Sequence, residues 1–211
     1  MKIRNATFIK SGTKPAHFPE LELPEVAFAG RSNAGKSSLM NCLLLRKDLV
    51  RVSSTPGRTQ ILSWFSVNDE ILLCDLPGYG FAKVPLKLKK EWGPMVGNYL
   101  QHRSNLRALV IITDARRGFS DDDMMLFESA LQLGLHTIFV ATKCDKLTRN
   151  ELYNQKLAIG KAVNMDPETD IVWFSAVTGS GRDQLWERLM NLTGAAPAPE
   201  LTPWPVDADD E

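Results

Sequence analysis

A loop near the start of the chain has the residue types and spacing that hold a phosphate group. Residues 30–37 read Gly-Arg-Ser-Asn-Ala-Gly-Lys-Ser and fit G-x-x-x-x-G-K-[ST] without a gap. An apolar run at 26–29 precedes the loop and a helical pattern follows it, so strand, loop and helix occur in the required order. Glycines let backbone N–H groups turn inward at an anion, and the helix dipole adds positive charge. We expect Lys36 to reach the β- and γ-phosphates and Ser37 to hold Mg²⁺, against the alternative of an ordinary strand-to-helix turn.

An acidic residue directly follows the apolar run 71–74 and opens the sequence Asp-Leu-Pro-Gly. In a phosphate-loop protein, an Asp that leaves a strand holds Mg²⁺ through its water shell, and Asp75 has this place. Gly78 has no side chain, so its N–H group can approach a γ-phosphate. Alone these four residues would be an ordinary turn, and their distance from the phosphate loop is what favours a binding role.

A polar segment between the first predicted helix and the next strand carries the threonines Thr55 and Thr59. A Thr hydroxyl here can bind Mg²⁺ only while a γ-phosphate is present, which would make residues 55–60 a switch. We expect Thr59 to be this ligand, with Thr55 as the competing candidate.

Two further strand ends carry residues suited to a purine base. Asp145, in Thr-Lys-Cys-Asp after the run 137–141, can accept hydrogen bonds from guanine N1–H and the 2-amino group, whereas adenine lacks this pair of donors. Lys143 is expected to lie along the base plane or to brace the phosphate loop. The backbone amides of residues 175–177 can meet the guanine O6, although this motif is the least specific. The five segments in this order favour a guanine nucleotide over the substrate of an ATPase or adenine nucleotide kinase.

Alternating strands and helices would bring these segments to one edge of a sheet. We predict strands at 26–29, 61–67, 71–74, 109–113, 137–141 and 171–174, and helices at 36–45, 86–100, 120–133, 149–163 and 181–191. This alternation predicts a three-layer α/β fold with a mostly parallel, six-stranded sheet. Residues 68–70 are too few for a crossover, so their flanking strands must form one antiparallel hairpin. Such sheets bind ligands beyond the carboxyl ends of their strands.

The third predicted helix has boundary signals at both ends. Ser120 suits the N-cap and the three aspartates at 121–123 suit the helix dipole, so we interpret these carboxylates as a helix start rather than a metal cluster. Gly134 is expected at the C′ position that ends the helix.

Regions outside this pattern differ in composition. Residues 1–24 are rich in proline and are interpreted as an N-terminal extension with a candidate short strand at 6–10, residues 25–194 as the nucleotide-binding domain, and residues 195–211 as a disordered acidic tail. The tail holds five acidic side chains and no Lys or Arg, so the rest of the chain has a formal charge of +5. This charge permits a nucleic-acid partner without requiring one.

The chain has no apolar stretch near the roughly 18 residues of a membrane span and no signal-peptide pattern, so we expect a cytoplasmic protein without a membrane partner. Cys42, Cys74 and Cys144 lie far apart, in or beside apolar segments, and are expected to be buried free thiols. The three histidines have no partner pattern and receive no catalytic role.

With these residues in view, the sequence resembles the TRAFAC-class GTPases, and specifically the EngB family, also called YihA or YsxC. The likeness runs from about residue 26 to 191 and is most specific at 26–38, 55–60 and 75–80. It implies a Ras-like G domain that binds GTP with Mg²⁺, assists assembly of the large ribosomal subunit and is linked to cell division and septation. Thr142 stands where GTPases in general usually have Asn in N-K-x-D. The EngB family resembles this chain in that variation, so the guanine motif is still expected to bind guanine.

The motifs and the resemblance together define the expected site. We assign catalytic roles to Lys36, Thr59 and Gly78, and Mg²⁺ binding to Ser37, Thr59 and Asp75. The residues expected to contact GTP or GDP are Gly30, Arg31, Ser32, Asn33, Ala34, Gly35, Lys36, Ser37, Gly57, Arg58, Thr59, Gln60, Ile61, Asp75, Leu76, Pro77, Gly78, Thr142, Lys143, Cys144, Asp145, Phe174, Ser175 and Ala176.

Hydrolysis is expected to need help from a partner. Ras-like GTPases orient the attacking water with a Gln directly after D-x-x-G, and this chain has Tyr79 there. We therefore expect an unassisted rate on the order of 10⁻⁴ to 10⁻² per second. Asn33 either helps a bound K⁺ to neutralise transition-state charge or braces the switch. Arg58 is a candidate for phosphate or RNA contact, and a less favoured one for an arginine finger in cis.

The expected partner is a precursor of the large ribosomal subunit. A lysine-rich stretch that follows D-x-x-G either contacts rRNA phosphates of this partner or is a solvated helix face. Its residues are Phe81, Lys83, Lys87, Lys89, Lys90 and Trp92. The alternative function is a nucleotide-gated scaffold for division proteins with little hydrolysis. A small-molecule phosphotransferase is disfavoured by the guanine motif and by the lack of an acceptor lid. A monomer is expected.

Overall fold

The computed structural model describes residues 1–50, 61–80 and 86–194, and for residues 86–92 the backbone alone. The strands are β1 (Ala6–Gly12), β2 (Glu25–Gly30), β3 (Leu62–Val67), β4 (Ile71–Asp75), β5 (Leu106–Asp114), β6 (His136–Thr142) and β7 (Ile171–Trp173). The helices are α1 (Lys36–Leu44), α2 (Leu86–His102), α3 (Asp121–Gln132), α4 (Arg149–Val163) and α5 (Arg182–Thr193), with short 3₁₀ helices η1 (Pro15–His17) and η2 (Cys144–Lys146). Every strand and helix predicted from the sequence is present, with ends shifted by no more than three residues.

All strands belong to one sheet with the order β1-β3-β4-β2-β5-β6-β7. The five strands from β4 to β7 in this order run parallel. Strand β3 runs antiparallel to β4, with Val67 opposite Ile71. The predicted hairpin is therefore confirmed.

The sheet has seven strands, one more than the six we expected. The additional strand is β1, which confirms the candidate short strand at 6–10 in the segment interpreted as an extension. It pairs antiparallel with β3, Ala6 opposite Val67 and Gly12 opposite Leu62. Only the two end residues of β1 are buried, and the side chains between them do not alternate between buried and exposed. Its sequence therefore lacks the period-two pattern that identifies a half-buried strand.

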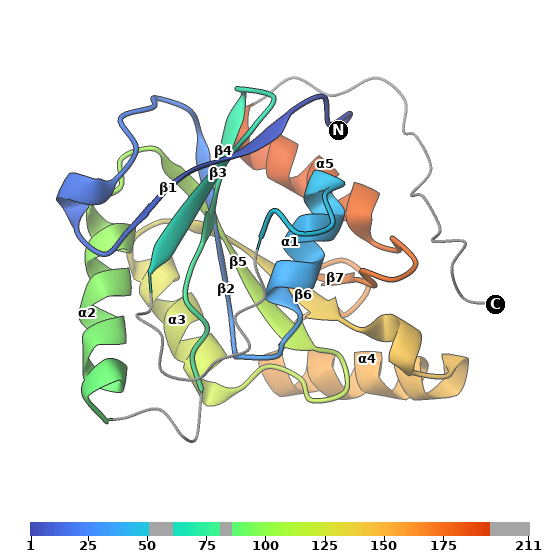
Figure 1. The fold of residues 1–211 in the computed structure, drawn as a ribbon. Helices are drawn as coiled ribbons and strands as arrows, with labels where there is room; N and C mark the ends of the chain where they lie inside the picture. The colour runs from blue at the N-terminus through green and yellow to red at the C-terminus, as the bar shows by residue number, and fades with distance from the viewer. Residues whose placement is uncertain (51–60, 81–85, 195–211) are drawn as a thin grey trace.

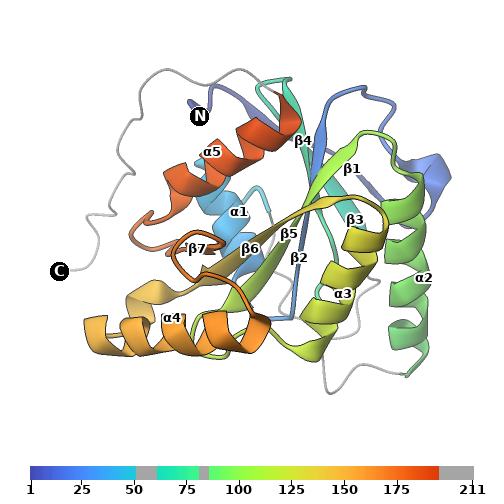
Figure 2. The ribbon, with the colours of Figure 1, turned by 180° about the vertical axis from the view of Figure 1, so that it is seen from behind.

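The helices form two layers around the sheet, as Figures 1 and 2 show from opposite sides. Helices α1 and α5 cover one face, and α2, α3 and α4 cover the other. Along β2 the side chains alternate between the two layers, Val26 and Phe28 facing α1 and α5, and Ala27 and Ala29 facing the other helices. The predicted three-layer α/β fold is confirmed.

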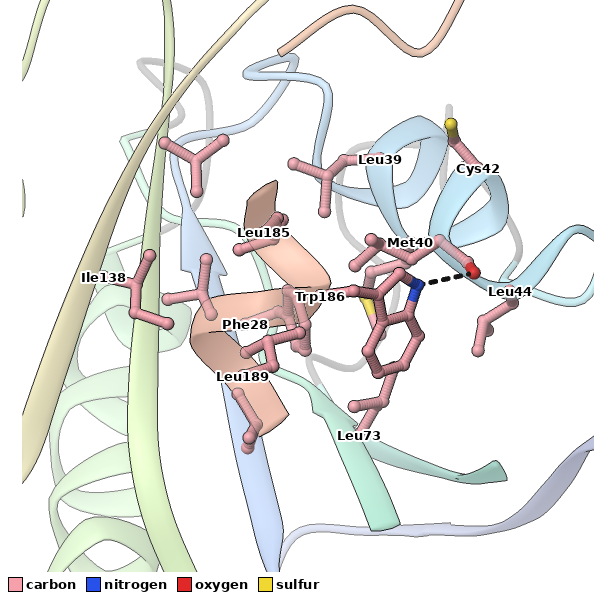
Figure 3. Packing of buried hydrophobic residues seen from close by; sticks show 14 of the residues in the cluster. Phe28, Leu39, Met40, Cys42, Leu44, Leu73, Ile138, Leu185, Trp186 and Leu189 are labelled. Carbon is pink, nitrogen blue, oxygen red and sulfur yellow. Dashed lines mark hydrogen bonds between the residues drawn. The ribbon is translucent and has the colours of Figure 1, made fainter. Parts of the chain in front are cut away.

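Trp186 of α5 joins the first helical layer to the core. Its side chain is fully buried in a cluster with Met40 and Leu44 of α1 (Figure 3). The indole N–H donates to the backbone oxygen of Leu43 at 3.2 Å. This packing fixes α1, whose first turn begins at the end of the phosphate loop.

The predicted ends of α3 are confirmed. The Ser120 side chain accepts a hydrogen bond from the Asp123 backbone, and the Asp123 side chain accepts one from the Ser120 backbone, which is a capping box. Gly134, with φ of 69°, follows the C-cap residue Leu133. The aspartates at 121–123 therefore form a helix start.

Within the described ranges, no helix has the length and apolar character that crossing a bilayer requires. Cys42 and Cys74 are buried and Cys144 is half-buried, and all three thiols are free. The predicted disordered tail lies outside the described residues.

Candidate nucleotide-binding site

The carboxyl ends of the parallel strands lie along one edge of the sheet. In the register of the sheet, Phe28 of β2 lies opposite Asp75, and Asp114 of β5 lies opposite Thr142 of β6. The segments that follow β2, β4, β6 and β7 therefore emerge side by side, as the sequence predicted.

The phosphate loop connects β2 to α1 along a tightly constrained backbone path. A Cβ at Gly30 would lie 2.6 Å from the backbone oxygen of Ile112, so a side chain there would collide with β5. Gly35 has φ of 94° and Asn33 has φ of 65°, and a Cβ at Gly35 would lie 3.0 Å from the Thr142 hydroxyl. The backbone thus turns between two strand ends in the way that a phosphate cradle requires.

The charged and hydroxyl groups at the end of the loop suit a phosphate and a magnesium ion. The Lys36 ammonium forms an ion pair with the Asp75 carboxylate at the end of β4, and both side chains are largely buried. Ser37 lies in the first turn of α1, beside Lys36. A carboxylate and a hydroxyl oxygen are ligands that Mg²⁺ accepts, and the ammonium can neutralise a phosphate. The residues present therefore fit both groups.

The hydroxyl of Ser32 is a second sign of a ligand-binding loop. Its oxygen is buried and has no hydrogen-bond partner among the described residues. A buried polar atom of this kind is costly unless something pairs with it, and a phosphate oxygen could accept a hydrogen bond from this hydroxyl.

The D-x-x-G segment lies against the phosphate loop. The Ser32 N–H donates to the backbone oxygen of Tyr79 at 2.9 Å. A Cβ at Gly78 would lie 3.0 Å from the Ser32 hydroxyl, so the glycine allows the close approach. The Tyr79 side chain is buried and its hydroxyl donates to the Asp123 carboxylate of α3. This side chain has no amide to orient a water as Gln does in Ras-like GTPases.

Thr142 connects the guanine motif to the phosphate loop. Its hydroxyl lies within hydrogen-bond distance of the backbone oxygen of Ala34, and 3.0 Å from that of Thr113 on β5. The hydroxyl is buried with both carbonyls. Thr142, at the end of β6, therefore links the start of the guanine motif to the phosphate loop and to β5.

Lys143 braces the phosphate loop, one of the two roles that the sequence left open. Its ammonium donates to the Asn33 backbone oxygen at 2.7 Å and lies 3.1 Å from the Asp114 carboxylate. The Arg116 guanidinium donates to both Asp114 oxygens, at 2.9 and 2.7 Å. Burial alone would raise the pKa of Asp114, but the hydrogen bonds from Arg116 and Lys143 outweigh it and hold the pKa well below its usual range.

The groups expected at the base lie together beyond β6 and β7. The Ser175 hydroxyl donates to the Asp145 carboxylate at 2.7 Å, which fixes the rotamer of the carboxylate. The Cys144 N–H donates to the Phe174 backbone oxygen at 3.2 Å and joins the two loops. Burial raises the pKa of the Cys144 thiol to about 11, so the thiol remains neutral.

Several predicted contacts have side chains that point into the core. Ala34, Leu76 and Phe174 are buried among apolar residues. Their backbone groups are therefore the parts available to a nucleotide. Ile61, by contrast, is exposed at the start of the segment that leads into β3.

The sequence missed two groups at this edge, the Asp114–Arg116 pair and Asp123. Asp114 ends the buried strand β5 in the same way that Asp75 ends β4, and this position was the available signal. Asp123 was recognised only as part of a helix start, since sequence spacing does not reveal a contact with Tyr79, 44 residues earlier.

The switch predictions at Thr55, Gly57, Arg58, Thr59 and Gln60, and those at Phe81 and Lys83, fall outside the described residues. Lys87, Lys89, Lys90 and Trp92 lie in or beside the first turns of α2, where only the backbone is described. The roles assigned to these residues stay predictions.

Comparison with known proteins identifies the family. The family model described as "50S ribosome-binding GTPase" matches residues 25–143. "Probable GTP-binding protein EngB" of Geobacter metallireducens is 51% identical over 195 residues, which cover 92% of this chain and 95% of that protein. The protein of the same name from Citrifermentans bemidjiense is 50% identical over 198 residues, covering 94% of this chain and 92% of its own.

A solved structure supports the fold. The crystal structure of a probable GTP-binding protein EngB has a TM-score of 0.66 and 21% sequence identity, and the match covers 81% of this chain and 98% of that chain. With sequence relatives near 50% identity over most of the chain, the chain belongs to the EngB family of GTP-binding proteins and has the P-loop GTPase fold.

Proposed function

We propose that this chain binds GTP and GDP with Mg²⁺ and hydrolyses GTP at a low rate until a partner completes the site. The observation that carries the proposal is the grouping of the phosphate loop, Asp75, Lys143, Asp145 and Ser175 at one edge of the sheet. Lys36 and the backbone of residues 30–37 hold the phosphates, and Asp145 selects guanine.

Magnesium, when bound, would neutralise charge on the β- and γ-phosphates. Ser37 and Asp75 would hold it, together with Thr59, which is assigned from the sequence alone. The Lys36 ammonium, paired with Asp75 in this structure, can turn to the phosphates while the Asp75 carboxylate remains beside the ion. Gly78 N–H is the group that meets the γ-phosphate.

The low rate follows from the residue at position 79. The Tyr79 hydroxyl is engaged by Asp123, so an attacking water needs another group to orient it. Purified protein alone should turn over GTP on the order of 10⁻⁴ to 10⁻² per second. A turnover of several per second without any added particle would contradict this part of the proposal.

The partner that we propose is a precursor of the large ribosomal subunit, with assembly of that subunit as the function and normal division and septation as its consequence in the cell. Membership of a family whose model is described as a 50S ribosome-binding GTPase supports this partner. The formal charge of +5 outside the acidic tail is compatible with an RNA-rich particle. We place the activity in the cytoplasm, in a monomeric protein.

Co-sedimentation tests the partner. The protein should pellet with large subunits in the presence of a non-hydrolysable GTP analogue and much less so with GDP, and addition of subunits should raise the GTPase rate. Asp145→Asn, which should bind GTP poorly, is the matched control. Equal pelleting with both nucleotides would remove the assembly role. Binding to division proteins with no effect of ribosomal particles on the rate would favour a nucleotide-gated scaffold, the alternative that Tyr79 makes reasonable.

A second cation, K⁺, is part of the proposal through Asn33. This residue is exposed and has φ of 65°, and its backbone oxygen accepts a hydrogen bond from the Lys143 ammonium, which leaves the side chain out of that contact. Hydrolysis should then be faster in K⁺ than in Na⁺. Equal rates in the two salts would leave Asn33 as a brace for the switch.

A further inference from the structure

Tyr79 is held at both ends, its backbone by the phosphate loop and its side chain by α3. Arg31 and Tyr79 face each other in a short parallel bridge, and the Ser32 N–H donates to the Tyr79 backbone oxygen at 2.9 Å. At the other end, the phenolic hydroxyl donates to the Asp123 carboxylate. The residue therefore spans from the phosphate loop to a helix on one face of the sheet.

Asp123 does more than a helix cap requires. It is fully buried, and one carboxylate oxygen, Oδ2, accepts from the Ser120 N–H at 2.7 Å and from the Ser120 hydroxyl at 2.6 Å. The other oxygen, Oδ1, accepts from Tyr79. Asp121 and Asp122 lie in the same turn and are exposed, so the dipole alone does not explain a buried carboxylate. Burying this charge is costly unless both oxygens are hydrogen-bonded, and Tyr79 provides the second partner.

The hydroxyl of Tyr79 is a permanent donor in this arrangement. Burial, together with the neighbouring Asp123 carboxylate, raises the pKa of Tyr79 far above its ordinary value. The phenol is therefore protonated at neutral pH and can donate to Asp123.

The residue before Tyr79 is Gly78, whose N–H group is expected to meet the γ-phosphate. Gly78 lies so close to the phosphate loop that a Cβ there would be 3.0 Å from the Ser32 hydroxyl. On the other side, Gly80 has φ of 75° and a Cβ there would lie 2.6 Å from Arg31 Nε. Tyr79 thus lies between two glycines that pack closely against the phosphate loop. Its buried side chain is the group in this segment that can hold their backbone in position.

We propose that Tyr79 is a positioning residue for the γ-phosphate: its hydrogen bond to Asp123 anchors the D-x-x-G loop to α3 and so holds Gly78 where it contacts GTP but not GDP. The inference rests on the proposed function. It assigns to the residue that replaces the usual Gln a structural role in recognising the triphosphate. Because GDP has no γ-phosphate, loss of the anchor should weaken binding of GTP and spare that of GDP.

Tyr79→Phe tests the anchor because it removes only the hydroxyl. We expect the affinity for a non-hydrolysable GTP analogue to fall about tenfold while the affinity for GDP stays within about twofold, since one hydrogen bond to a charged acceptor is lost. The matched control is Tyr99→Phe. Tyr99 also donates from a buried hydroxyl to a buried carboxylate, Glu25 at 2.5 Å, but at the amino end of β2, away from the phosphate loop. Its ratio of GTP to GDP affinity should equal that of the wild type.

Two further variants separate the anchor from the stability of α3. Asp123→Ala should lower the ratio as much as Tyr79→Phe, and the double variant should lower it no further, because both remove the same bond. Ser120→Ala removes the other half of the capping box and should lower the melting temperature while the ratio stays unchanged. Each variant is checked for cooperative unfolding. If Asp123→Ala does not fold, the conclusion depends on Tyr79→Phe, which keeps the aromatic ring in the core.

The inference would be overturned, with the proposed function intact, if the ratio of GTP to GDP affinity in Tyr79→Phe were within about twofold of the wild type. The same holds if Tyr99→Phe or Ser120→Ala lowered this ratio as much as Tyr79→Phe does. A wild-type chain that binds neither GTP nor GDP would overturn both. Additive losses in the Tyr79→Phe and Asp123→Ala double variant would also overturn it, because the two residues would then act independently.

Discussion

The Thr142 hydroxyl lies between two buried backbone oxygens, those of Ala34 in the phosphate loop and Thr113 on β5. One side chain thus ties the guanine motif to the loop that holds the phosphates. Because both carbonyls are buried, the Thr142 hydroxyl is the group that satisfies them at this junction.

We predict that Thr142→Val lowers the affinity for GDP about tenfold, because it leaves a buried carbonyl of the phosphate loop without its donor, a loss of about 1–2 kcal/mol. Isothermal titration calorimetry measures this, and Thr142→Ser, which keeps the hydroxyl, should restore most of the affinity. Thr137→Val is the control on the same strand, since the buried Thr137 hydroxyl has no hydrogen-bond partner in the described part of the chain. Wild-type affinity in Thr142→Val would show that the hydroxyl does not support the loop.

Asp114 should make a pH-dependent contribution to stability. Its pKa in the folded chain is held below the usual 3.8 by Arg116 and Lys143, against the opposing effect of burial. A group with a lowered pKa stabilises the fold fully above its unfolded value and loses this contribution as pH falls below it. Asp114→Asn should therefore lower the free energy of unfolding by about 1–3 kcal/mol at pH 7.

The difference between wild type and Asp114→Asn should shrink by about 1 kcal/mol between pH 7 and pH 3, as Asp114 becomes protonated in the unfolded chain. Urea unfolding at the two pH values measures this. A difference that is the same at both would contradict the ionic role of Asp114.

At the scale of residues, the sequence was informative wherever a motif has a fixed spacing. Residues 30–37, Asp75 and Asp145 lie at or just after the ends of β2, β4 and β6, where the local runs of residues predicted strand ends, and their binding roles stay predictions. Asp114 and Asp123 were missed as site residues because their partners, Lys143 and Tyr79, are brought to them only by the packing of separate elements.

At the scale of elements, α2 is fastened to the sheet by a buried polar cluster at the amino end of β2. Glu25 is fully buried and accepts from Trp64 Nε1 at 2.7 Å, from the Tyr99 hydroxyl at 2.5 Å and from Arg103 Nε at 2.7 Å. Arg103 also donates to the backbone oxygen of Pro19 at 2.9 Å, so the cluster holds the N-terminal segment as well. Three elements and a loop therefore depend on one carboxylate.

We predict that Glu25→Ala lowers the free energy of unfolding by about 3–5 kcal/mol, because it leaves the Arg103 guanidinium buried without its partner. Urea unfolding gives the value. Glu70→Ala is the control, since the Arg4–Glu70 pair is exposed and should contribute less than about 1 kcal/mol. The nucleotide affinity of the folded Glu25→Ala protein should be unchanged. Equal destabilisation by Glu25→Ala and Glu70→Ala would show that burial does not set the strength of the Glu25–Arg103 pair.

The elements themselves were largely predictable. The hairpin of β3 and β4 followed from a connection too short for a crossover, and α3 followed from Ser120 and Gly134. Strand β1 was predicted only as a candidate short strand at 6–10 and was not counted in the sheet, because an edge strand with mostly exposed side chains carries little hydrophobic pattern and its pairing with β3 is decided by tertiary contacts.

At the scale of the whole molecule, the two edges of the sheet have different tasks. The carboxyl edge holds the phosphate loop, where the buried Ser32 hydroxyl has no hydrogen-bond partner among the described residues. At the amino edge, Glu25 accepts hydrogen bonds from Trp64, Tyr99 and Arg103, and of this cluster only Arg103 Nη2 has no partner among the described residues. One helical layer covers each face of the sheet (Figure 1, Figure 2). Changes at the carboxyl edge should therefore affect ligand binding first, and changes at the amino edge should affect stability first.

Loops from separate strands converge at this edge, and we propose that they hold a guanine nucleotide whose base is recognised by Asp145. Calorimetry with magnesium on the wild type and on Asp145→Asn tests it most directly. The wild type should bind GTP at least about 100-fold more tightly than ATP. Asp145→Asn should lose GTP and gain xanthosine triphosphate, because an amide can donate to the 2-oxo group of xanthine where a carboxylate cannot. ATP binding as tight as that of GTP, or GTP affinity unchanged in Asp145→Asn, would show that this edge of the sheet is not a guanine-specific site.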